Sequence, residues 1–333
     1  MEIDSQNMLG VLKAFPNQLE EALNLAEKIN ITGTFDHIIV AGMGGSGHCG
    51  DILAAYAQHA GLKIPVFVVR DYTLPSFVSN KSLVFLVSYS GNTEETLSAF
   101  DQALARQARM IIITSGGKLQ RMAEDLRPLV LVPSGLQPRL SIGYLFVPIL
   151  IILAHAKIIQ DPSAQIRETA AFLRSTDAAF ATQDVAFAIK GAVPLIYTST
   201  NYRIAGYIWK ILINECSKTH AFNHTLPEMN HNEINAYKNL NSRYFALFLE
   251  DESDHPRIKD RVRITKEIIA KSNVESLHIL LKGHSFLAKL FNVIHMGMYV
   301  SYYLALAYET DPTPVPVIEN LKVLLAKPEP QHQ

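Results

Sequence analysis

Residues 41–51 read AGMGGSGHCGD and residues 88–96 read SYSGNTEET, and these two stretches decide the fold. Each of them lies at the end of a short apolar run and is followed by a segment whose apolar residues have helical spacing. Runs that are apolar on both faces are typical of buried strands in a parallel sheet. Both stretches are therefore predicted to be strand-to-helix turns of a doubly wound α/β sheet.

The same pattern extends along the whole chain. Strands are predicted at residues 38–43, 66–69, 83–88, 110–115 and 129–134, and in the second half at residues 193–199, 244–250 and 276–283. Helices are predicted at residues 51–59, 94–105, 118–126, 140–159, 166–190, 202–216, 257–271, 285–308 and 316–325. A polar break near residue 160 divides the two sets, so two α/β domains are predicted, of residues 1–159 and 160–333.

The composition excludes several classes of protein. Hydrophobic residues make up 48% and charged residues 18% of the 333 residues, so the chain can bury a core and is not mainly disordered. Lys plus Arg number 30 and Asp plus Glu number 31, a balance that does not favour binding to nucleic acid. The N-terminal residues lack the apolar core of a signal peptide. The longest apolar stretch, residues 144–156, is shorter than the ~20 residues of a membrane span, so no membrane association is predicted.

Cysteine usage points to a reducing compartment. The chain has two cysteines, Cys49 and Cys216, which cannot form a disulfide framework. A cytoplasmic location is therefore expected.

The two turns have the composition of an anion site. Ligands of open parallel sheets bind at the carboxyl ends of the strands, where these turns lie. Glycines allow the backbone N–H groups to approach a ligand, and a helix N-terminus adds a partial positive charge. Ser46, Ser88, Ser90 and Thr93 would add hydroxyl donors. Neither turn contains Lys or Arg, and the Walker pattern is absent. The hydroxyl-rich second turn favours a terminal phosphate over a pyrophosphate.

Other interpretations of the turns remain open. The glycines of the first turn match the dinucleotide pattern G-x-G-x-x-G, but the acidic residue that a ribose needs is not at the expected distance. The glycines could also simply permit a tight turn. Asn92 and Thr93, followed by Glu95, could be no more than a helix cap.

Residues 214–237, NECSKTHAFNHTLPEMNHNEINAY, gather titratable side chains in a stretch interpreted as a loop. Glu215 ends a predicted helix, where the negative end of the helix dipole favours proton uptake, as a catalytic base requires. A metal site is an alternative, formed by His220, His224 and His231 with Glu228. These side chains could also be ordinary surface polar groups.

Three groups of residues together resemble a known family. Gly-Gly-Ser at residues 44–46 and S-x-S-G-x-T-E-E-T at residues 88–96 resemble the sugar isomerase (SIS) domain. N-E-x-x-K from residue 214, P-E-M-N-H-N-E-I from residue 227 and D-P-T-P-V-x-x-I-x-x-L-K from residue 311 are similar to the bifunctional phosphoglucose/phosphomannose isomerases. The resemblance implies two SIS domains, a homodimer with the active site between domains and subunits, and no metal or organic cofactor.

The resemblance also implies roles for individual residues. The residues that match the phosphate site of a hexose 6-phosphate are Gly45, Ser46, Ser88, Ser90 and Thr93. Glu215 corresponds to the base that moves a proton between C2 and C1, and Arg139 to the arginine near the enediolate. His231, contributed by the neighbouring subunit, and Lys322 correspond to the ring-opening groups. Apart from the resemblance, Thr313 is a candidate for shaping the pocket around C2 and C3 because it lies near Lys322 in the sequence.

The expected activity is interconversion of glucose 6-phosphate and fructose 6-phosphate, and also of mannose 6-phosphate, through a cis-enediol(ate). Each residue type suits its step: imidazole for ring opening, a carboxylate for proton transfer and a fixed cation for the enediolate. The first alternative is a non-catalytic sugar-phosphate sensor that uses the same phosphate site. An aminosugar synthase would need an N-terminal nucleophilic cysteine, which the sequence MEIDSQ lacks, and a metal hydrolase would be inactivated by chelators.

Overall fold

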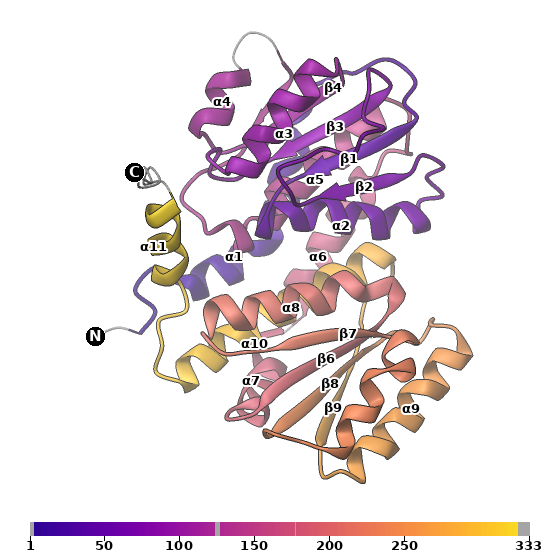
Figure 1. Ribbon diagram of the computed structural model, residues 1–333, viewed down its shortest axis with the longest axis vertical. Coiled ribbons are helices and arrows are strands. Elements are labelled where there is room, and N and C mark those ends of the chain that lie inside the picture. Colours follow the sequence, from indigo (N-terminus) through magenta and orange to yellow (C-terminus); the bar gives the residue numbers. More distant parts are fainter. Residues whose placement is uncertain (1–2, 124–126, 177, 326–333) are drawn as a thin grey trace, which may run out of the picture.

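Runs of buried aliphatic residues form two parallel sheets in the computed structural model, which describes residues 3–123, 127–176 and 178–325 (Figure 1). The first sheet has the strand order β2-β1-β3-β4-β5 and the second has the order β7-β6-β8-β9. The strands are β1 (His37–Ala41), β2 (Val66–Val69), β3 (Ser82–Val87), β4 (Arg109–Thr114), β5 (Leu129–Leu131), β6 (Val193–Ser199), β7 (Phe222–Leu226), β8 (Tyr244–Glu250) and β9 (Glu275–Leu280). All strand pairs in both sheets are parallel, which confirms the predicted α/β architecture.

Helices cover both faces of the sheets. They are α1 (Met8–Glu21), α2 (Gly44–His59), α3 (Glu94–Ala105), α4 (Gly117–Ala123), α5 (Ile142–His155), α6 (Ser163–Ser175), α7 (Ala178–Ile189), α8 (Arg203–Cys216), α9 (Pro256–Ala270), α10 (Phe286–Ala307) and α11 (Pro316–Leu325). In β1, Ile38 and Val40 pack into one apolar cluster, while Ile39 and Ala41 pack into another on the opposite face. This two-sided burial explains why the strands appear as continuous apolar runs.

One apolar core continues from the first half of the chain into the second. It contains Phe15 of α1, Phe146 of α5, Trp209 of α8 and Phe291 of α10. Trp209 is fully buried, and its indole Nε1 donates a hydrogen bond to Val293 O (2.7 Å). Figure 1 shows α2 and α8 lying between the two sheets. The boundary at residue 159 stays a prediction, because the two halves share this core.

The helix α10 has the length and composition of a membrane span, unlike the shorter apolar stretch singled out from the sequence. It has 22 residues, and 78% of its most apolar window is buried inside the protein. Within the described part of the chain it is the one helix that meets both criteria. Its place in the core between α7 and α8 explains the apolar composition.

Several elements differ from the sequence-based prediction. The helix α1 is absent from that prediction, and β7 lies inside the stretch interpreted as a loop. Residues 166–190 form two helices, α6 and α7, where one helical stretch is predicted. The helix α2 begins at Gly44, so most of the first glycine-rich turn is itself the first turns of a helix. Residues 124–126, at the end of the predicted helix after β4, lie outside the described residues.

Candidate active site

The first glycine-rich turn connects β1 to α2. No side chain caps this helix, so its first N–H groups remain available to an anion. Ser46 is 4% exposed, and its Oγ accepts a hydrogen bond from Tyr89 N (3.0 Å). A Cβ at Gly45 would lie 2.5 Å from Pro138 O, in the short helical turn η2 (Pro138–Leu140). Glycine is therefore required at residue 45 because η2 packs against the start of α2.

The second turn connects β3 to α3 and carries the other hydroxyl groups. Ser88 is 1% exposed, and its Oγ lies 2.9 Å from Thr93 Oγ1 and accepts a hydrogen bond from Gly91 N (3.1 Å). Thr93 occupies the N-cap position of α3, but its side chain makes no capping hydrogen bond. The simple helix-cap interpretation is therefore wrong for Thr93. Ser90 is exposed and its Oγ accepts a weak hydrogen bond from Asn92 N (3.3 Å).

The two turns lie next to each other because their strands are neighbours. β1 and β3 pair directly, with Ala41 opposite Leu86. The hydrogen bond between Tyr89 and Ser46 then joins the second turn to the first. Two uncapped helix N-termini and the hydroxyl groups of Ser88 and Thr93 consequently share one edge of the sheet. Such a set of uncharged donors suits a phosphate group.

Arg139 and Glu215 form an ion pair beside the first turn. Arg139 Nη1 lies 3.2 Å from Glu215 Oε2, and the two side chains are 2% and 25% exposed. Arg139 belongs to η2, which is the turn that contacts Gly45. Glu215 lies near the C-terminal end of α8. The structure therefore brings the phosphate turn, the arginine and the carboxylate together from three distant parts of the chain.

Arg139 is fixed by hydrogen bonds from all three of its nitrogen atoms. Nη2 donates to Pro312 O (3.1 Å) and Thr313 O (2.7 Å), and Nε donates to Cys216 Sγ (3.3 Å). Nη1 donates to Gln137 Oε1 (3.3 Å) as well as to Glu215. A guanidinium held in this way is a preorganised positive charge, and it can stabilise a negative charge that develops on a bound molecule.

Glu215 keeps one side open to solvent. Its side chain is a quarter exposed, and its carboxylate pairs with Arg139. Lys218 Nζ donates to the backbone carbonyl of Glu215 (2.6 Å) and of Cys216 (3.2 Å), so it holds the end of α8 in place. A positioned carboxylate next to a fixed cation is the arrangement that proton abstraction beside a carbonyl group requires.

Some of these contacts have no signal in the sequence. The carbonyl groups of Pro312 and Thr313 bind Arg139 through the backbone, which residue letters do not report. Thr313 itself, the predicted pocket residue, is 4% exposed, and its Oγ1 has no hydrogen-bond partner within the described chain. Lys218 could have been singled out, since it is the lysine of the N-E-x-x-K motif.

His231 is not joined to the other predicted site residues within one chain. It ends the short helical turn η4 (Glu228–His231), and its side chain is exposed. No hydrogen bond or ion pair between described residues connects it to Arg139 or Glu215. The rest of its motif is anchored: Met229 is fully buried, and Asn230 Nδ2 donates to Thr265 Oγ1 (2.8 Å). His231 is therefore presented outward from a fixed turn.

Lys322 also stands apart from the ion pair. It lies on α11, a helix without buried residues. Figure 1 shows α11 projecting to one side of the two layers. The apolar side chains of this helix are uncovered, with Val317 81% and Leu321 54% exposed. The segment that leads into α11 is nevertheless anchored, because Arg139 binds the carbonyl of Thr313, three residues before the helix begins.

The histidines considered for a metal site lie on different elements. His224 is in β7, and its Nδ1 accepts a hydrogen bond from the N–H of Thr225 (2.8 Å). The i, i+4 pairing on a helix that zinc would favour is therefore not formed by His220 and His224. Across the described residues, no group of three or more His, Cys, Asp or Glu side chains is arranged to hold a metal ion.

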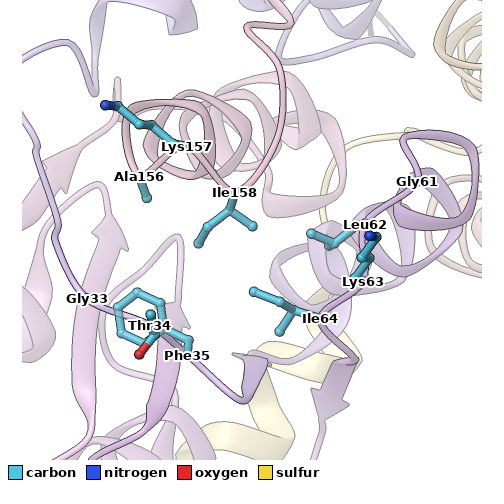
Figure 2. A pocket seen from close by; sticks show the side chains of 10 residues that line it. All are labelled: Gly33, Thr34, Phe35, Gly61, Leu62, Lys63, Ile64, Ala156, Lys157 and Ile158. Carbon is cyan, nitrogen blue, oxygen red and sulfur yellow. The ribbon is translucent and has the colours of Figure 1, made fainter.

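The molecule also has a hollow of about 500 Å³ far from these turns (Figure 2). Its lining segments, residues 33–35 and 61–64, precede β1 and β2, so it lies at the amino edge of the first sheet. In Figure 2 the side chains of Phe35, Ile64 and Ile158 face the hollow. Ligands of α/β sheets bind at the opposite edge, so this hollow is not the candidate active site.

Two family models match the chain. The model of the SIS domain matches residues 35–127, and the model of the bacterial phospho-glucose isomerase C-terminal SIS domain matches residues 181–325. The two matches contain the first four and the last four strands, respectively. Each half of the molecule is therefore similar to an SIS domain.

Curated relatives are similar along almost the whole chain. A bifunctional phosphoglucose/phosphomannose isomerase of Aquifex aeolicus is 37% identical over 95% of this chain and 98% of its own length. The enzyme of the same name from Caldicellulosiruptor bescii is 37% identical over 94% of this chain and 97% of its own length. A solved structure, a hypothetical protein of Thermus thermophilus, superposes with a TM-score of 0.76 at 18% identity, covering 97% of this chain and 92% of that one.

Proposed function

Because the chain belongs to the family of bifunctional phosphoglucose/phosphomannose isomerases, we propose that it interconverts glucose 6-phosphate and fructose 6-phosphate, and mannose 6-phosphate with the same ketose. The observation that carries the proposal is the Arg139–Glu215 ion pair, built against the glycine turn that offers uncapped N–H groups. A sensor would need the phosphate turns alone. An enzyme needs catalytic groups in addition. The partly exposed carboxylate of Glu215, next to a guanidinium whose nitrogens are all hydrogen-bonded, is such a pair of groups.

The proposed reaction moves one hydrogen along the sugar. The phosphate group binds to Gly45, Ser46, Ser88, Ser90 and Thr93 and does not react, so its binding energy serves to position the sugar. In the open-chain aldose, the Glu215 carboxylate takes the proton from C2. The C2–H electron pair forms the C1–C2 double bond of the enediolate, and the carbonyl electrons move to O1.

The same carboxyl group completes the isomerisation. O2 loses its proton to O1, and Glu215 then returns its proton to C1, which leaves the carbonyl group at C2. Arg139 stabilises the negative charge of the enediolate. Because C2 is planar in this intermediate, glucose 6-phosphate and mannose 6-phosphate, which differ only at C2, give the same enediolate. Thr313, buried next to Arg139, is proposed to shape the pocket that admits both.

Ring opening is proposed to use Lys322 and His231 of the partner subunit. Support comes from the exposed position of His231 on an anchored turn and from the uncovered apolar side chains of α11, which carries Lys322. An imidazole is a residue type that can act as acid and base at the ring oxygen and the C1 hydroxyl group. The proposal thus includes a homodimer in which each site takes one histidine from the other chain.

A cytoplasmic location and the absence of any metal or organic cofactor are part of the same proposal. Both cysteines are free and buried, and Cys216 Sγ serves as an acceptor for Arg139, a role that an unoxidised sulfur fulfils. The steps above need only protons and charges that the side chains supply.

The first test is a coupled assay on both 6-phosphates with the variant Glu215→Gln. We expect turnover to fall by roughly 10³-fold or more, since an amide cannot take up the C2 proton. Binding of a phosphorylated sugar should persist. The control is Glu252→Gln, a change at an exposed glutamate after β8, which should keep full activity. Unchanged turnover in Glu215→Gln would refute the role given to Glu215, whereas a wild-type protein without turnover would leave the sensor as the better explanation.

A subunit-mixing experiment tests the origin of His231. Glu215→Gln and His231→Ala are each expected to form inactive homodimers. In a mixed dimer, one site has Glu215 from one chain and His231 from the other, so a random one-to-one mixture should regain about a quarter of wild-type activity. No recovery after verified subunit exchange would contradict the shared site and place His231 in its own chain's site.

A further inference from the structure

A second cavity, of about 490 Å³, lies between the two halves of the molecule. One wall is α2, and the other is formed by the start of α8 and by β7; the lining residues that matter here are Asp51, Arg70, Asn201, Arg203, Tyr207 and Asn223. Arg203 begins α8 and Glu215 lies twelve residues later, a separation of about 18 Å along a helix. The cavity is therefore distinct from the candidate active site.

The side chains around this cavity are predominantly basic. Two cations flank the ring of Tyr207, with Arg70 Cζ at 5.8 Å and Lys210 Nζ at 6.0 Å from the ring centre. Arg203 is exposed at the mouth and has no hydrogen-bond or ion-pair partner among the described residues. The lining contains one carboxylate, that of Asp51. The charged side chains of the lining are thus two arginines, Arg70 and Arg203, and one aspartate, Asp51.

Arg70 is held in place for binding. It follows β2, and both of its terminal nitrogens contact the Asp51 carboxylate. Its Nη2 also donates to Gly47 O (3.0 Å) on α2. Its Nε is buried next to Gly47, away from the cavity, and has no partner in the described chain. The Arg70 guanidinium is therefore a fixed positive charge that remains partly exposed at the cavity wall.

We propose that this cavity is a second anion site that binds a small phosphorylated molecule or free phosphate. Arg203 supplies an unpaired positive charge, the partly exposed Arg70 adds a second, and the amide groups of Asn201 and Asn223 are available to the remaining oxygens. The volume exceeds that of a phosphate ion and falls in the range of sites for small metabolites. The inference stands on this cavity and does not depend on the isomerase activity.

Equilibrium binding of inorganic phosphate and of glycerol 3-phosphate to the full-length protein tests the proposal. Wild-type protein should bind two equivalents per chain, one in the phosphate turns and one in the cavity. Arg203→Gln should weaken the cavity site at least about tenfold, because a charge-assisted contact is lost, and should leave isomerase turnover unchanged. Ser88→Ala should weaken only the other site. Tighter binding of glycerol 3-phosphate than of phosphate at the cavity would identify a metabolite as the ligand.

The matched control is Arg257→Gln, which removes an exposed arginine from α9, and it should preserve both sites. A single wild-type equivalent that Ser88→Ala weakens and Arg203→Gln leaves unaltered, or two unaltered equivalents in Arg203→Gln, would overturn the proposal. Should the phosphate turns fail to bind, loss of the one remaining equivalent in Arg203→Gln would still support the cavity site, so the two proposals fail separately.

Discussion

The two sheets place the same kind of turn at equivalent positions, but the side chains in these turns differ in charge and in hydrogen bonding. β1 and β6 hold matching places in their sheets, as do β3 and β8. After β3 come the hydroxyl groups of Ser88 and Thr93, which leave the helix end uncapped. After β8 comes the carboxylate of Asp251. The comparison teaches that topology supplies the position of a turn, while a few side chains decide whether it accepts an anion.

In the turn after β8, groups of the protein itself pair with the carboxylate of Asp251. Asp251 is 4% exposed and accepts hydrogen bonds from Lys289 Nζ (2.6 Å), Tyr202 OH (2.7 Å) and Ser253 N (2.9 Å). Burial alone would raise the pKa of Asp251, but these hydrogen bonds outweigh it and lower the pKa to about 2. A fixed negative charge at this point excludes a phosphate dianion. The cavity proposed above lies on the other side of β6, beside β7, and takes Arg70 from the first half.

The largest effect is expected from a substitution that adds a side chain to the first turn and so disturbs its packing. Gly45→Ala would place a Cβ 2.5 Å from Pro138 O, so η2 must move away and carry Arg139 with it. We expect kcat/KM to fall by about 100-fold while the protein stays folded, because a displacement of about 1 Å at a catalytic group has such effects. Steady-state kinetics and circular dichroism provide the measurements.

The control for this variant is Gly44→Asn. Residue 44 has open space around its Cβ position and a φ of 50°, a conformation that asparagine tolerates. If Gly44→Asn reduced kcat/KM as strongly as Gly45→Ala, the close packing of η2 would not be the reason for the glycine.

The second prediction concerns a variant in which the turn after β8 loses the negative charge of Asp251. The folded-state pKa of Asp251 is depressed from 3.8 to about 2, so its contribution to stability is present above the unfolded-state value and is lost as the pH falls through the folded one. Asp251→Asn should therefore lower the free energy of unfolding by roughly 2 kcal/mol at neutral pH. The deficit should shrink as the pH falls from about 5 toward about 2.

Denaturant unfolding of the wild type and variant at several pH values measures this difference. Asp260→Asn is the matched control, since Asp260 is paired with Arg257 on the surface of α9. The difference between the control and the wild type should be small and nearly independent of pH. A deficit of Asp251→Asn that stays constant down to the acid limit would show that its charge is not what stabilises the turn.

The third prediction compares serines on the two edges. Ser88→Ala removes the acceptor of the Gly91 N–H group and the partner of Thr93, so KM for the hexose 6-phosphate should rise about tenfold. Ser253→Ala, after β8, removes a hydroxyl group that contacts Lys289 (3.4 Å) and should leave KM unchanged. Equal effects of the two changes on KM would mean that the edges do not differ in function.

Much of the fold was predictable because burial on both faces leaves a clear trace in the residue letters. The bounds of β2, β6, β8, α3 and α11 agree with the prediction to the residue. β7 was not predicted because it is an edge strand whose residues, FNHTL, include polar side chains that are only partly buried. α1 was not predicted because Pro16 lies inside it, and a proline within a segment argues against a helix there.

The candidate site was predictable only in part. The turn chemistry of Ser46 and Ser88 follows from local composition, and their proximity follows from neighbouring strands. The ion pair of Arg139 with Glu215 joins residues 76 positions apart, and no local pattern encodes that separation. The resemblance to a family supplied both residues. Their geometry, and the backbone carbonyls that hold the arginine, required the fold.

The reach of Arg139 has a consequence for how the protein matures. Its guanidinium needs carbonyl groups that lie 173 and 174 residues further along the chain. During translation the first sheet and its glycine turns can form well before those groups leave the ribosome. A nascent chain would thus form the turns that bind phosphate early, and complete the Arg139–Glu215 pair that transfers the proton late. Ligand binding in such a chain would therefore precede turnover.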